Sequence, residues 1–133
     1  MKYETLVSKQ DYLEFTGIDL DTELVSLMIN DVGDAPAERF IRSVENWCLE
    51  WLKINYFFNG IFLSSHQKEC FKKGVMYQMA YIIKNGDISN DSGYLMETSQ
   101  LIPKSELLKI QMSENALRCF RNGGMANFMR IAI

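Results

Sequence analysis

The stretch from Pro36 to about Tyr56 constrains the fold most, because its apolar residues recur at the spacing of one helix face. Pro36 suits the first turn of a helix, where its missing N–H costs no hydrogen bond. The apolar stripe consists of Ala37, Phe40, Ile41, Val44, Trp47, Cys48, Trp51 and Leu52. The other faces carry Glu38, Arg42, Glu45, Asn46, Glu50 and Lys53, which we interpret as a solvated, partly ion-paired surface. A helix of this kind must be covered by other segments along most of its length.

A second long helix is predicted to start at Ser64 or Ser65, either of which can cap it, and to end at Asn85-Gly86. Its expected inward face consists of Cys70, Phe71, Val75, Met76, Met79, Ala80, Ile82 and Ile83. The dense apolar link at 57–63 favours a tight turn between the two helices over a short extended segment. The chain would then place the two long helices against each other.

Shorter helices are predicted around this pair. Ser8 and Asp11 form a capping pattern that Gly17 terminates, and Asp19 or Asp21 can cap a second helix that ends at Gly33. Near the C-terminus, Ser113-Glu114 opens a helix that ends at Gly123-Gly124, and a possible short helix begins at Ser105. We therefore expect one all-α domain over 1–133, an antiparallel long-helix hairpin with short packing helices and room for small extended pieces at 94–103.

The composition fits an ordinary globular protein, with 47% hydrophobic, 12% aromatic and 23% charged residues. The net charge of −3 argues against a general nucleic-acid binder, which needs an excess of Lys and Arg to neutralise phosphates. Three widely spaced cysteines form neither a CxxC pair nor an even-numbered disulfide framework, so we expect reduced thiols in a cytosol. Apolar runs are too short for a membrane helix, and no membrane partner is expected.

The residues give little indication of an active site. The single histidine, His66, has Glu69 and Cys70 on the same predicted helical face, which is a weak pattern for zinc without a second histidine or a CxxC pair. Ser64 and Ser65 beside it are better explained by helix capping than by nucleophilic catalysis. We therefore expect no enzyme activity, no catalytic residue, no metal and no cofactor.

The C-terminal segment 125–133 is unusually apolar for a chain end, and it either packs on its own domain or docks into a partner. The residues expected to bind a partner are Met125, Phe128, Met129, Arg130, Ile131 and Ile133. We treat this segment as a candidate assembly tail.

Several local strings resemble the head-tail connector, or adaptor, proteins of long-tailed bacteriophages. The resemblance lies in the opening helix from Ser8 to Gly17, the capped helix from Asp21, the long amphipathic helix through Trp47 and Trp51, and the closing string from Met112 to Gly124. Members of that family are small helical proteins without a catalytic residue, and they form a ring beneath the portal.

The resemblance implies a structural role in the virion neck, after assembly in the bacterial cytoplasm. Identical subunits would form a ring that binds the portal protein on one face and the next neck or head-completion protein on the other. DNA would pass through the ring without sequence-specific binding, which suits an acidic protein. The alternative is a small helical regulatory or adaptor protein that binds a host or phage protein.

Overall fold

The computed structural model describes residues 5–27, 36–56, 58–85 and 112–126. In these ranges the secondary structure is helical and contains no strand, which confirms the all-α prediction. The helices are α1 (Lys9–Thr16), α2 (Leu20–Leu27), α3 (Pro36–Asn55), α4 (Ser65–Asn85) and α6 (Glu114–Asn122). The expected extended pieces at 94–103, the helix from Ser105 and the end of the second helix at Gly33 lie outside the described residues.

The helix boundaries follow the capping residues. Ser8 forms a complete capping box with Asp11 at the start of α1, and Gly17 ends that helix in the left-handed conformation at φ 78°. Ser64 caps α4, because its Oγ accepts the Gln67 backbone N–H at 3.1 Å. Ser113 caps α6 through the N–H of Ala116. The predicted capping role of Ser64 is thus confirmed.

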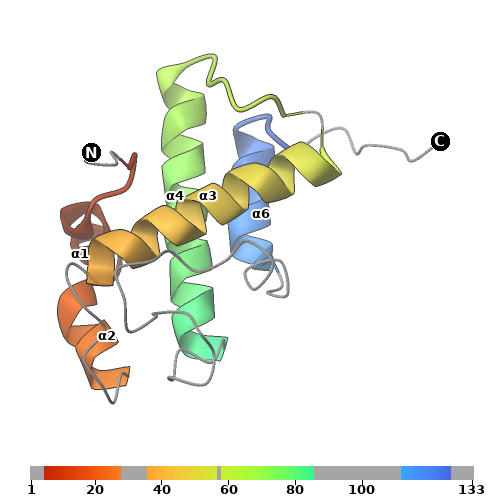
Figure 1. Cartoon of the computed structure of the whole chain (residues 1–133). Coiled ribbons are helices and arrows are strands. Elements are labelled where there is room, and N and C mark those ends of the chain that lie inside the picture. The colour runs from red at the N-terminus through yellow and green to blue at the C-terminus, as the bar shows by residue number, and fades with distance from the viewer. Residues whose placement is uncertain (1–4, 28–35, 57, 86–111, 127–133) are drawn as a thin grey trace.

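The predicted hairpin of the two long helices is not confirmed. Figure 1 shows α3 lying obliquely across α4, with α1 and α2 on one side of α4 and α6 on the other. The helix that runs alongside α4 is α6, in the antiparallel direction. Gly123 lies beside Cys70, Phe120 lies against Gly74, and the Ser113 N–H donates to the Gln78 side chain at 2.7 Å.

Gly74 explains why α4 pairs with α6. A Cβ atom at this position would stand 2.3 Å from Cε1 of Phe120 and within 2.8 Å of two more ring carbons. The missing side chain therefore gives the Phe120 ring its place against α4. Both Phe120 and the adjacent Phe71 are fully buried, with ring centroids 5.7 Å apart.

The core contains both predicted apolar stripes. From α3 and α4 it takes Phe40, Ile41, Val44, Trp47, Cys48, Leu52, Phe71, Val75, Met79 and Ile82 among others, whereas Trp51, Ala80 and Ile83 are only partly buried. A row of aromatic rings begins on α3 and ends at Tyr56 just after it, with 6.4 Å between the ring centroids of Trp47 and Trp51 and 5.7 Å between those of Trp51 and Tyr56. Oblique packing of α3 on α4 thus forms the centre of the domain.

One polar prediction for α3 is wrong. Glu45 is 3% exposed rather than solvated, and Arg39 is also buried. The Glu45 carboxylate accepts hydrogen bonds from the backbone N–H groups of Leu6, at 3.0 Å, and Val7, at 3.2 Å. The segment before α1 covers this face of α3, and its amides give the buried carboxylate the partners it needs.

Candidate functional site

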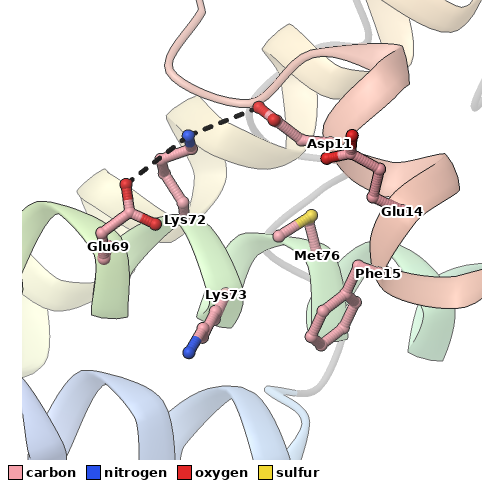
Figure 2. A pocket seen from close by; sticks show the side chains of 7 residues that line it. All are labelled: Asp11, Glu14, Phe15, Glu69, Lys72, Lys73 and Met76. Carbon is pink, nitrogen blue, oxygen red and sulfur yellow. Dashed lines mark ion pairs between the residues drawn. The ribbon is translucent and has the colours of Figure 1, made fainter.

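A groove lined mainly by charged side chains lies between α1 and α4. It has a volume of about 260 Å³ and is lined by Asp11, Glu14, Phe15, Glu69, Lys72, Lys73 and Met76. Figure 2 shows Lys72 between Asp11 and Glu69, while Lys73 points away from that group. The Lys72 Nζ lies 3.4 Å from Asp11, which joins α4 to α1, and 3.7 Å from Glu69 on α4 itself.

The electrostatics of the groove suit a contact between helices. Burial acts to raise the pKa of Asp11, but hydrogen bonds from Ser8 and the Lys72 ammonium outweigh it and hold the pKa below its usual value. Asp11 therefore stays ionised at neutral pH and is already engaged by the α1 cap and by Lys72. We assign this groove to the docking of α1 on α4.

A second depression of about 490 Å³ lies where α1 and α2 meet the end of α4. It is lined by Tyr12, Thr16, Ile18, Glu23, Ala80, Ile83 and Lys84. Burial, together with the neighbouring Glu23 carboxylate, raises the pKa of Tyr12 to about 12. Tyr12 is thus a neutral hydroxyl at physiological pH, which fits its position in the core better than a role in proton transfer.

The fold brings together only two of the three residues in the predicted zinc pattern, His66 and Cys70. His66 Nε2 lies 3.6 Å from the Cys70 Sγ, but Glu69 pairs with Lys72 instead. Within the described ranges, no three His, Cys, Asp or Glu side chains are grouped so that they could hold a metal ion. Burial raises the pKa of the Cys119 thiol and raises that of Cys48 strongly, so both are protonated at neutral pH.

The candidate assembly tail begins inside the core. Gly124 has φ 81°, and the Met125 N–H donates to the Phe120 carbonyl at 2.9 Å, as in a Schellman ending. Met125 is 2% exposed and Ala126 is 3% exposed, so Met125 packs on its own domain. The other five residues expected to bind a partner, Phe128, Met129, Arg130, Ile131 and Ile133, lie outside the described residues.

The structure adds an exposed apolar surface that sequence reasoning missed. Ile54 at the end of α3 is 52% exposed, and Ile61 and Leu63 in the α3–α4 connection are 63% and 84% exposed. We call these three residues the corner surface. In the same connection Phe58 is buried and Phe62 is partly buried, and the Phe62 ring packs 5.0 Å from Phe71. The alternation of buried and exposed residues over 61–63 is the sequence signal that could have revealed it.

Comparison with known proteins adds no relative, since no protein family, curated protein or solved structure matches this chain. Among the described residues, no helix is both long enough and apolar enough to cross a membrane. The candidate site is accordingly defined by the corner surface and the anchored base of the tail.

Proposed function

We propose that this chain is a structural subunit of a bacteriophage head-tail connector, forming a ring under the portal that links the DNA-filled head to the neck or tail. The proposal draws on the resemblance of the capped helices and the closing string to that family. The observation that carries it furthest is the corner surface, because three strongly exposed large aliphatic side chains around the α3–α4 connection would be covered in a protein–protein contact.

In a ring-forming connector, the function depends on the surfaces that bind neighbouring proteins and not on a catalysed reaction. A head-to-tail contact between identical subunits closes into a ring when the rotation between neighbours allows it. The portal protein and the next neck protein would then bind the two faces of the ring. DNA would cross the channel without being read, in keeping with a net charge of −3.

Native mass spectrometry of the protein, alone and with a candidate portal ring, tests the proposal. A ring, or a defined number of subunits bound to the portal, would support it. A variant ending after Ala126 should lose that binding while keeping the core, since Met125 and Ala126 remain in place. A monomer that does not respond to any portal would instead favour the regulatory adaptor that binds another host or phage protein.

A further inference from the structure

We infer that the tail of one copy, residues 127–133, docks on the corner surface of a second copy. This inference rests on the proposed function and names the contact that joins neighbouring subunits. The tail sequence Asn-Phe-Met-Arg-Ile-Ala-Ile holds four large apolar residues, which match an aliphatic surface.

The corner surface is held in place by the helix that follows it. The Leu63 backbone N–H donates to Gln67 Oε1 at 2.7 Å, and Gly60 adopts φ 87° beside the Lys53 side chain. Inward packing of Phe58 and Phe62 leaves Ile61 and Leu63 on the outside. The surface is therefore presented by an anchored connection, which lowers the entropy cost of binding.

The base of the tail is anchored at the same end of the molecule. Gln67 Nε2 donates to the Gly123 carbonyl at 2.9 Å, so one amide side chain joins the end of α6 to the connection that carries Leu63. Figure 1 shows the end of α6 beside the α3–α4 connection. The seven residues after Ala126 can span at most about 23–25 Å, which sets the greatest distance at which a neighbouring corner surface can lie.

Within the described ranges the surface is open to a second copy, since Ile54, Ile61 and Leu63 are 52%, 63% and 84% exposed. The tail and the corner surface are different parts of the protein, so their contact is heterologous. Each subunit then offers one tail and one surface, which is the arrangement that builds rings rather than closed dimers.

Mixing two defective full-length variants tests the inference. The surface variant carries Ile61→Ser and Leu63→Ser, and the tail variant carries Phe128→Ser and Ile131→Ser. The control carries Leu13→Ser and Ile18→Ser, which remove exposed apolar side chains elsewhere. Each is measured by sedimentation velocity over a concentration series up to its solubility limit, and circular dichroism checks that all are folded.

The wild type and the control should self-associate, whereas each defective variant alone should need at least about tenfold higher concentration, since burial of a single large aliphatic side chain is worth roughly that factor. The mixture should form dimers with one subunit of each kind, because one intact surface and one intact tail remain.

Three results would overturn the inference: a wild type that stays monomeric throughout, a surface variant that associates like the wild type, or a folded mixture that forms no dimer. A tail that covers its own corner surface would give the first result. Portal binding is measured separately, so a protein that binds portal but fails the mixing test would retain the connector function without this contact.

Discussion

At the residue scale, Glu45 departs most from what its position in the sequence predicts. A glutamate among other charged residues on an amphipathic helix indicates a solvated face, yet this side chain is 3% exposed. Its partners are the backbone amides of Leu6 and Val7, nearly forty positions earlier. Backbone donors carry no residue-type signal, so the sequence gives no indication of this contact.

Glu45→Gln should change how stability depends on pH. Burial raises the pKa of Glu45 above its usual 4.5, and the Leu6 and Val7 amides, with Lys72, only partly oppose this. The folded protein then holds this proton more tightly than the unfolded chain, so the contribution of Glu45 to stability falls as the pH rises above about 4.5. Gln does not titrate. The difference in unfolding free energy, wild type minus variant, should therefore fall with rising pH.

Denaturant unfolding of both proteins at several pH values between acid and neutral measures that difference. A difference that grows with pH would mean that the amide hydrogen bonds outweigh burial and that the folded protein prefers the ionised carboxylate.

At the element scale, capping residues in the sequence predicted where helices begin and end. Which helices pack against each other depends on close side-chain contacts that the sequence does not display. The caps at Ser8, Ser64 and Ser113 and the glycine ending at Gly17 are short-range patterns that the sequence displays directly. The pairing of α4 with α6 depends on Gly74, a glycine inside a helix. Such a glycine signals a close approach, but it does not say which segment approaches.

Ser8→Ala should cost about 1 kcal/mol of stability, because it removes the acceptor for the Asp11 N–H at the start of α1. Thermal or urea unfolding measures the loss. Ser65→Ala is the matched control: Ser65 is exposed and lies inside the first turn of α4, after the capping Ser64, so its replacement should change stability by only a few tenths of a kcal/mol. Equal effects at both serines would contradict the capping role.

Gly74→Ala should destabilise the protein by about 1–2 kcal/mol. Overpacking a core typically costs about 1–3 kcal/mol. We expect a cost near the upper end of that range at Gly74, since three ring carbons of Phe120 would stand within 2.8 Å of the new Cβ. The helix-propensity gain of about 1 kcal/mol offsets part of it. In a Phe120→Leu background the same substitution should cost less. A stabilising Gly74→Ala would show that α6 does not pack closely at this point.

At the scale of the whole molecule, composition and periodicity were sufficient to predict an all-α fold, whereas the assembly role of the apolar tail stays a prediction. The residues left open whether that segment packs on its own domain or on a partner. The structure separates the segment into two parts. The Schellman ending at Gly124 places Met125 in the core, so only residues 127–133 are still candidates for binding a partner.

This division predicts a sharp difference between two truncated chains. Ending the chain after Gly124 removes Met125 and Ala126 from the core, whereas ending it after Ala126 keeps both. Loss of a buried Met side chain costs about 2–5 kcal/mol, so the shorter chain should be less stable by that amount. Thermal unfolding of the two proteins side by side measures it. Equal stability would place Met125 outside the cooperative core.

Both tryptophans of the chain lie within one turn of each other on α3, so the protein carries a spectroscopic probe of that helix. Far-UV circular dichroism, by contrast, reports on all helices together. In a two-state protein the two signals change at the same denaturant concentration. A fluorescence transition at a lower denaturant concentration than the circular dichroism transition would reveal an intermediate. In it α3 has detached from the core while α4 and α6 remain packed through Gly74 and Phe120.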